Sequence, residues 1–227
     1  MHIPKPAVDY RRFRFSRLDT DEFRHLKLLL YWPVFFLLFI YVERFSPVET
    51  YYPISSPLDA HIPFCEFFLI PYLFWFVYLV GMHLYTLLYD VEAFRKMMRF
   101  VMISYTITMA IYLLFPTCQE LRPPVFERDN LFTRIVSFWY VFDTNTNVCP
   151  SLHVIGSAAV WCTSLHTERF RTAPWRIFFC VTAVLICVST VFLKQHSIID
   201  VFVALPICVI AYYFAFRYRP RKNKEVT

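Results

Sequence analysis

Glycine is scarce in this sequence, because Gly81 and Gly156 are the only two among 227 residues. Membrane helices often approach one another through GxxxG seams, where two small residues four apart let the backbones come close. No pair of glycines has that spacing here. We therefore expect helices that pack without such seams, with residues 156–159 as the one compact run of small side chains.

Cysteine pairs of the kind that bind zinc or act in redox reactions are also missing. None of the seven cysteines forms a CxxC motif, which argues against both kinds of site. Most of them fall inside apolar runs, where cysteine behaves as a small hydrophobic residue. Cys118 and Cys149 bracket a predicted loop, and spacing alone leaves open whether they form a disulfide.

Charge is sparse relative to apolar content. Charged residues make up 18% of the chain, against 58% hydrophobic and 20% aromatic residues, and the mean hydropathy is +0.45. A single soluble core of this size could not bury so many apolar side chains. Six apolar runs instead predict helices that cross a hydrocarbon layer about 30 Å thick. These runs are residues 26–42, 64–88, 100–116, 151–165, 176–193 and 198–216.

The runs predict an all-α polytopic membrane protein with six transmembrane helices in a single membrane domain, 1–227. A basic segment at 1–25 precedes the six-helix core at 26–216, which contains an outer loop at 117–150, and a basic tail at 217–227 follows. The first run begins after about 25 residues, and no small-residue cleavage site follows it, so we interpret it as a retained helix.

Lysine and arginine are distributed unevenly around the six runs. Most of the 23 lysines and arginines lie in the N-terminal segment, near residues 89–99 and 166–176, and in the tail. If the chain crosses the membrane at each run, these four segments are all on the same side. The positive-inside rule then predicts that both termini face the cytoplasm. Basic flanks beside anionic headgroups account for the net charge of +6, so we expect no nucleic-acid partner. The remaining five cations lie on the other side: Arg44, Arg122, Arg128, Arg134 and Lys194.

Ionisable residues within apolar runs are functional candidates, because charge is costly in hydrocarbon. The predicted topology collects several of them on the outer face, although they are far apart in sequence. Asp59, His61 and Glu66 either contact a headgroup or pack at the interface, and we favour packing. The candidates that converge are Glu66, His153 and Asp200 at helix ends, Lys194 and His196 in a short turn, and Arg122 in the outer loop.

The spacing of these residues favours phosphoryl transfer through histidine. His196 and Asp200 are four apart, so a carboxylate can hold one imidazole nitrogen and leave the other free. In "NVCPSLHV", Ser151 is a candidate N-cap, and the N–H groups of the helix start after it can bind an anion beside His153. Arg122 offers a planar fork for phosphate oxygens.

Two other interpretations compete with this one. A histidine at the end of a span is often only an interfacial side chain, and convergence of three segments on one face is what favours catalysis. Two histidines and an aspartate could also bind zinc. The anion-binding helix start and the adjacent Lys194 disfavour a cation there, so we predict no metal ion.

Three segments of the chain resemble the signature motifs of the type-2 phosphatidic acid phosphatase superfamily. They are "RPP" at 122–124, "CPSLH" at 149–153 and "STVFLKQHSIID" at 189–200. The resemblance implies that His196 is the nucleophile that becomes phosphorylated and that Asp200 orients it. His153 would protonate the leaving oxygen and later activate water. It implies no metal or cofactor, and it assigns phosphate binding to Arg122, Ser151 and neighbouring backbone amides, including that of Leu152.

The chain departs from the family pattern at three positions. Phe115 stands where the first motif has lysine, Leu152 replaces the glycine of the second motif, and Thr190 replaces the arginine of the third. Leu152 keeps a backbone N–H that can donate. If the fifth helix continues to Gln195, Lys194 shares a face with Thr190 and can put its ammonium where the arginine would reach. For the missing lysine, Arg128 and Arg134 are candidate substitutes.

With the two cationic positions lost and the two histidines and the aspartate retained, the chain resembles the phosphotransferase branch that includes sphingomyelin and inositol phosphorylceramide synthases. A phosphodiester carries less negative charge than a phosphomonoester and needs fewer cationic ligands. We therefore predict a metal-independent lipid phosphatase, with a lipid headgroup phosphotransferase as the first alternative and a non-catalytic lipid-binding or transport protein as the second. We expect a bacterial plasma membrane protein with its site on the outer face. The sequence predicts neither the lipid nor the oligomeric state.

Overall fold

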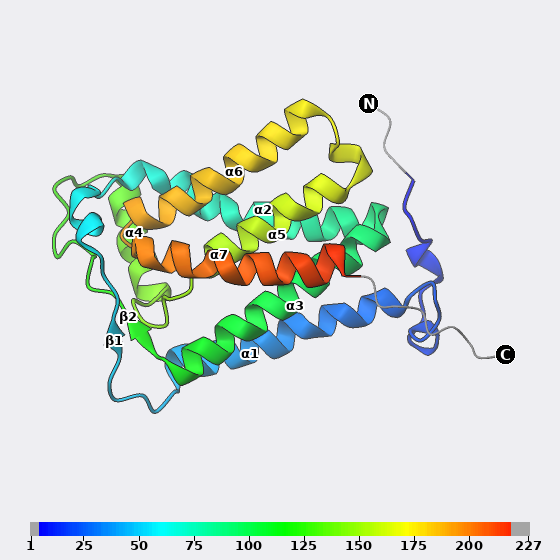
Figure 1. The fold of residues 1–227 in the computed structure, drawn as a ribbon, viewed down its shortest axis with the longest axis horizontal. Helices are drawn as coiled ribbons and strands as arrows, with labels where there is room; N and C mark the ends of the chain where they lie inside the picture. Colours follow the sequence, from blue (N-terminus) through cyan, green and yellow to red (C-terminus); the bar gives the residue numbers. More distant parts are fainter. Residues whose placement is uncertain (1–4, 219–227) are drawn as a thin grey trace.

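The computed structural model describes residues 5–218, and the chain is mostly helical. Most of the predicted tail at 217–227 therefore lies outside the described residues. The long helices are α1 (Tyr31–Arg44), α2 (Leu69–Tyr89), α3 (Val91–Leu114), α5 (Leu152–His166), α6 (Ala173–Phe192) and α7 (Ile198–Tyr212). A 3₁₀ helix, η3 (Arg24–Leu30), leads into α1, and a π-helical turn, η7 (Tyr213–Arg217), extends α7. Figure 1 shows these helices running side by side as a bundle.

Five of the six predicted spans correspond to helices that are long and apolar enough to cross a membrane. They are Arg24–Arg44, Glu66–Tyr89, Val91–Leu114, Ala173–Phe192 and Ile198–Arg217. Their outward faces expose large apolar side chains such as Leu37, Val77, Ile177 and Val209, as a helix in contact with lipid requires. We treat the protein as an integral membrane protein on this basis.

The sixth predicted span, 151–165, corresponds to α5, which has 15 residues and is shorter than the other five. A helix of this length is about 22 Å long, less than the hydrocarbon thickness. Helices α2, α3, α6 and α7 all pack against α5, so it forms the centre of the bundle. A short helix is accommodated there because protein, rather than lipid, surrounds it.

Gly156 allows this central packing. A Cβ added at Gly156 would lie 2.8 Å from Nε1 of Trp75 on α2 and 2.9 Å from the hydroxyl of Tyr105 on α3. Both distances are too short for a real contact, so the absence of a side chain lets α5 approach both helices. At Gly81, in contrast, an added Cβ would have no neighbouring atom within 4 Å.

Helix α3 begins earlier than the apolar run that predicts it. Asp90 caps the helix by accepting a hydrogen bond from the N–H of Ala93 at 3.0 Å, and α3 therefore starts at Val91 rather than near residue 100. Arg95, Lys96 and Arg99, which the hydropathy pattern places in a connection, lie in its first turns. Charged residues there are compatible with a helix because lysine and arginine are good helix formers.

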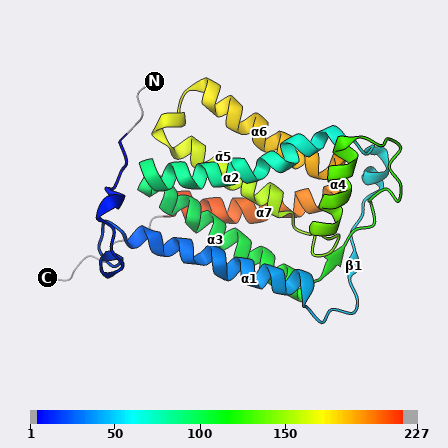
Figure 2. The ribbon, with the colours of Figure 1, turned by 180° about the vertical axis from the view of Figure 1, so that it is seen from behind.

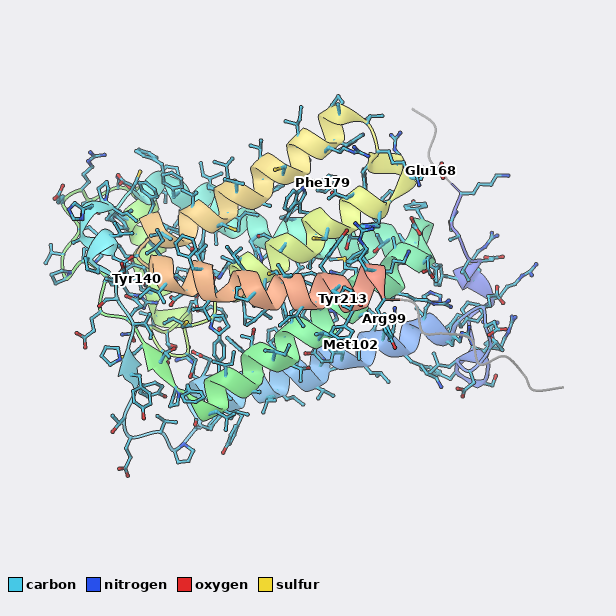
Figure 3. The ribbon with its side chains drawn as sticks, in the orientation of Figure 1. Arg99, Met102, Tyr140, Glu168, Phe179 and Tyr213 are labelled. Atoms are coloured by element: carbon cyan, nitrogen blue, oxygen red, sulfur yellow. The ribbon has the colours of Figure 1, made fainter. Side chains whose placement is uncertain are left out.

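The bundle has two distinct ends, which Figures 1 and 2 show from opposite sides. The N-terminal segment from residue 5 and the end of η7 lie together at the terminal end. The strands β1 (Tyr52–Pro53) and β2 (Thr117–Cys118) and the helix α4 (Leu131–Phe142) lie at the other, which we call the loop end. In Figure 3, Tyr140 lies at the loop end, whereas Glu168 lies toward the terminal end.

The predicted outer loop at 117–150 is more ordered than its composition suggests. It contains β2, which pairs in parallel with β1, and α4, which the sequence did not predict. Asn130 and Thr133 form a capping box at the start of α4, with hydrogen bonds of 3.0 Å in both directions. The connection between α1 and α2 contains two short 3₁₀ helices, η4 (Pro57–His61) and η5 (Glu66–Phe68), and packs against the same end.

Candidate active site at the loop end

His196 and Asp200 form a buried pair at the start of α7. Nδ1 of His196 lies 3.0 Å from Oδ2 of Asp200, which also accepts the N–H of Ser197 at 3.0 Å. Ser197 is the N-cap of α7, so His196 lies in the turn before the helix and not in its first turn. The carboxylate holds Nδ1 and leaves Nε2 of His196 available for chemistry. The structure therefore contains the pairing that the spacing predicted.

His153 approaches His196 from α5. The two ring centroids are 5.8 Å apart with a tilt of 66°, although the residues are far apart in sequence. The rings of Tyr72 and Trp75 on α2 pack against His153, with centroid distances of 4.4 Å and 4.6 Å. Both histidines are buried, and Nε2 of His153 has no hydrogen-bond partner within residues 5–218. The predicted convergence of these two segments is present in the structure.

The start of α5 carries unused polar groups beside the histidine pair. Ser151 is its N-cap, but its buried hydroxyl makes no capping hydrogen bond and has no other partner among the described residues. The first turn of any α-helix also leaves backbone N–H groups without intrahelical acceptors, here those of residues 152–154. The N–H of Ser151 donates to the carbonyl of Asp200 at 3.2 Å, which fixes this helix start against α7. Unused donors at a helix start are suited to an anion.

Arg122 is held by the protein instead of forming an open fork. Its terminal nitrogens donate to the carbonyls of Tyr140 at 2.9 Å, Asp143 at 2.7 Å and Thr144 at 2.9 Å. They also donate to Oε1 of Gln195 at 2.5 Å, and the guanidinium lies 4.3 Å above the ring of Tyr140. Burial lowers the pKa of Arg122 from its usual value. Only its Nε, which is buried and unpartnered among residues 5–218, remains free for a ligand.

Lys194 is not placed where the sequence hypothesis required. Helix α6 ends at Phe192, and Lys194 has a left-handed backbone with a φ of 55°, so it shares no helical face with Thr190. Its ammonium donates to the carbonyl of Asp59 at 2.8 Å and to that of Ile62. The expected substitution of Lys194 for the arginine therefore loses its geometric basis, because α6 ends three residues before Gln195.

The other proposed cation substitutes are also engaged. Phe115 ends α3 with 62% of its surface exposed. Nη1 of Arg128 lies 3.4 Å from the carboxylate of Glu66, and Arg134 forms a two-pronged pair with Asp129 at 2.8 Å and 2.9 Å. Glu66 also accepts a hydrogen bond from Asn130 at 3.0 Å, which supports the predicted packing role for this carboxylate.

Two further residues hold the turn that carries His196: Gln195, which the sequence motifs did not single out, and Asp59, which was expected to pack at the interface. Gln195 donates to Tyr72 and Asp143 at 3.3 Å, besides accepting from Arg122. Asp59 is only 1% exposed, and its carboxylate accepts hydrogen bonds from Ser197 and Ile198. The aspartate in "PLDAHIPF" was a visible signal, but its partner lies 138 positions away in the chain.

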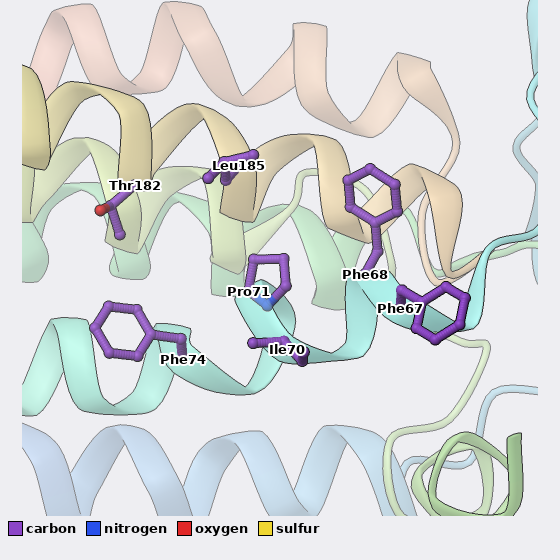
Figure 4. A pocket seen from close by; sticks show the side chains of 7 residues that line it. All are labelled: Phe67, Phe68, Ile70, Pro71, Phe74, Thr182 and Leu185. Atoms are coloured by element: carbon purple, nitrogen blue, oxygen red, sulfur yellow. The ribbon is translucent and has the colours of Figure 1, made fainter. Parts of the chain in front are cut away.

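An apolar groove of about 450 Å³ lies elsewhere, between the start of α2 and α6. Figure 4 shows its lining residues, which are Phe67, Phe68, Ile70, Pro71, Phe74, Thr182 and Leu185. None of them belongs to the candidate site. Among residues 5–218, no three His, Cys, Asp or Glu side chains are grouped so as to hold a metal ion, and Cys118 and Cys149 are free thiols.

Comparison with known families gives one match. A family model described as the PAP2 superfamily matches residues 97–224, more than half of the chain. The matched region contains Arg122, the start of α5 and the turn that carries His196. No curated protein and no solved structure matches the chain.

Proposed function

This chain belongs to the PAP2 superfamily, and from that premise we propose that it is a membrane-embedded enzyme that hydrolyses a lipid phosphate through a phosphohistidine at His196. The observation that carries the proposal is the buried group of His196, Asp200 and His153 beside a helix start with unused donors. A nucleophile, its orienting carboxylate and a second histidine are the parts that covalent phosphoryl transfer needs.

In the first step, Nε2 of His196 attacks phosphorus and the bond to the lipid oxygen breaks. Asp200 holds the proton on Nδ1 and stabilises the positive charge that the ring gains. His153 donates a proton to the departing lipid oxygen, which leaves as an alcohol. We assign the phosphate oxygens to the N–H groups at the start of α5, the hydroxyl of Ser151 and Nε of Arg122, because the latter two are buried and have no partner among residues 5–218.

In the second step, His153 is neutral and takes a proton from water. The resulting hydroxide attacks phosphorus, the bond to Nε2 of His196 breaks, and inorganic phosphate leaves. His196 returns to its neutral form with Nδ1 still donating to Asp200. We place the loop end in the outer leaflet, because the basic N-terminal segment lies at the opposite end of the bundle.

One observation favours a second candidate, transfer of a lipid headgroup to an alcohol. In the part of the chain that the structure describes, the terminal nitrogens of Arg122 and the ammonium of Lys194 already donate to protein oxygens. Few cationic donors therefore remain for a dianionic phosphomonoester, whereas a phosphodiester carries only one negative charge. In this reaction an alcohol replaces water in the second step, and the same two histidines act.

Purified protein in detergent tests the proposal directly. We expect phosphate release from at least one lipid in a panel of phosphomonoesters, diphosphates and phosphodiesters, in the presence of EDTA, and none from His196→Ala. Headgroup transfer predicts no phosphate release; it predicts a new phosphodiester and a freed lipid alcohol, formed only when a phosphodiester donor and an acceptor alcohol are supplied together. Lipid binding that persists in His196→Ala, with no turnover of any substrate by the wild type, would contradict both candidates and identify a binding protein.

A further inference from the structure

The turn that carries His196 is held by η4, a segment far from it in sequence. Asp59 lies in η4, and its buried carboxylate makes three hydrogen bonds. Oδ2 accepts from the hydroxyl of Ser197 at 2.6 Å and from the N–H of Ser56 at 2.7 Å. Oδ1 accepts from the N–H of Ile198 at 2.9 Å. One carboxylate therefore ties η4 to the first residues of α7.

Lys194 makes the reciprocal connection on the other side of His196. Its ammonium donates to the carbonyls of Asp59 and Ile62, so η4 receives a charged donor from the same turn to which it supplies acceptors. The left-handed backbone of Lys194 reverses the chain at the end of α6. The two backbone N–H groups that follow, those of Gln195 and His196, donate to the carbonyl of Thr190 at 3.0 Å and 3.1 Å.

The start of α7 depends on Asp59 as well. Ser197 caps the helix by accepting the N–H of Ile199 at 3.2 Å, while Asp200 accepts the N–H of Ser197. Asp59 accepts the remaining early N–H, that of Ile198, and its negative charge at a helix N-terminus is favourable. The same residues thus fix the helix end from which Asp200 reaches His196.

We propose that Asp59 and Lys194 are positioning residues that form a clasp around His196. The clasp holds residues 194 and 197–198, and so it fixes the backbone on both sides of the nucleophile without contacting the phosphate. The catalytic consequence rests on the proposed function, in which Nε2 of His196 attacks phosphorus. A reacting atom displaced by about 1 Å can lower a rate by about 100-fold.

Steady-state kinetics separate this role from phosphate binding by Lys194. If Asp59 and Lys194 form the clasp, Asp59→Asn and Lys194→Met should each lower kcat by about 10- to 100-fold with little change in KM. The double variant loses little more than the worse single variant, because each substitution already releases the turn at residues 194–198 from η4. A phosphate ligand behaves differently, since loss of Lys194 would raise KM and its effect would add to that of Asp59→Asn.

Matched controls exclude general effects of charge. Glu49→Gln removes an exposed carboxylate from the same connection, and Arg134→Gln removes an exposed cation from the loop end. Both should keep kcat within about twofold of the wild type, as expected of surface substitutions. Asp59→Glu restores the charge and should recover part of the kcat that Asp59→Asn loses. If Asp59→Asn fails to fold, Lys194→Met, which keeps the apolar stem, still tests the clasp.

Amide hydrogen exchange in detergent gives a readout that needs no substrate. The N–H groups of residues 195–198 should exchange at least about tenfold faster in Asp59→Asn and Lys194→Met, and at the wild-type rate in Glu49→Gln. Unchanged exchange overturns the clasp, and so does faster exchange without a fall in kcat in an active enzyme. An inactive wild type with faster exchange in the variants would refute the proposed function while leaving the clasp intact.

Discussion

His153 and His196 face each other across the centre of the loop end, with ring centroids 5.8 Å apart. One comes from the first turn of the short central helix α5, and the other from the turn between α6 and α7. Helices α2, α3, α6 and α7 pack around α5, and both histidines are buried. We propose that a phosphoryl group binds beside this pair, at the start of α5.

Asp200 should matter for rate more than for stability. Asp200→Asn keeps an acceptor for the N–H of Ser197 but no longer stabilises positive charge on His196. We expect kcat to fall by about 10³- to 10⁴-fold with the fold intact, by analogy with loss of the carboxylate from other histidine-based catalytic groups. Asp129→Asn, which changes an exposed carboxylate at the same end, should leave kcat unchanged. A fall of less than about tenfold in Asp200→Asn would refute the orienting role.

The two glycines should respond differently to alanine. Gly156→Ala places a methyl group against Trp75 and Tyr105 and pushes α5 away from α2 and α3, at a cost of about 1–3 kcal/mol in unfolding free energy. Activity should fall too, because Trp75 packs on His153. Gly81→Ala meets open space and should be neutral or slightly stabilising. Denaturant titrations of both variants in the same detergent measure the difference, and equal stabilities would contradict the packing described for α5.

Arg122 should be needed first for the structure of the loop end. Lysine cannot reproduce its contacts with Tyr140, Asp143, Thr144 and Gln195, so Arg122→Lys leaves buried acceptors unpaired. We expect the free energy of unfolding to fall by about 2 kcal/mol. The control Arg134→Lys changes an exposed ion pair and should cost less than about 1 kcal/mol. Equal stability of Arg122→Lys and the wild type would show that these contacts are dispensable.

The thiol of Cys149 should be unreactive over a wide pH range. Burial, with a further contribution from Asp200, raises its pKa to about 12. Because a raised pKa keeps the thiol protonated until the pH approaches that value, almost no thiolate forms between about pH 7 and pH 9. Alkylation of the folded protein, read out by peptide mass spectrometry, should therefore spare Cys149 at both pH values. Rapid labelling that increases tenfold per pH unit would show an accessible thiol with an ordinary pKa.

The apolar runs predict most of the fold because long hydrophobic segments have one stable arrangement in lipid. The predicted helix boundaries are wrong where a helix contains charged residues. In the first turns of α3, Asp90 caps a helix start that the hydropathy pattern does not include. Helix α4 was missed because a 12-residue amphipathic segment inside a polar loop is too short to be recognised as a span. The central place of α5 depends on contacts that its own sequence does not specify.

The site was predictable to the extent that it depends on local spacing. The pairing of His196 with Asp200 follows from residues four apart, and the motifs indicate that His153 belongs with them. The position of Lys194 could not be predicted, because it depends on where α6 ends and on a left-handed turn. Asp59 was assigned to interfacial packing, and its contact with Ser197 appears only when the connection between α1 and α2 is folded onto the loop end.

Covalent catalysis at His196 can be tested by trapping the phosphorylated enzyme. Protein incubated briefly with a lipid whose phosphate is radiolabelled, then quenched in alkali, should carry label that is stable to alkali and labile to acid, as a phosphohistidine is. We expect this label to map to the peptide containing His196 and to be absent from His196→Ala. In His153→Gln the label should form more slowly, because the leaving oxygen is no longer protonated, and should decay more slowly once formed, because water is no longer activated. Turnover of the lipid without any label on His196, or label that persists in His196→Ala, would contradict covalent catalysis at His196.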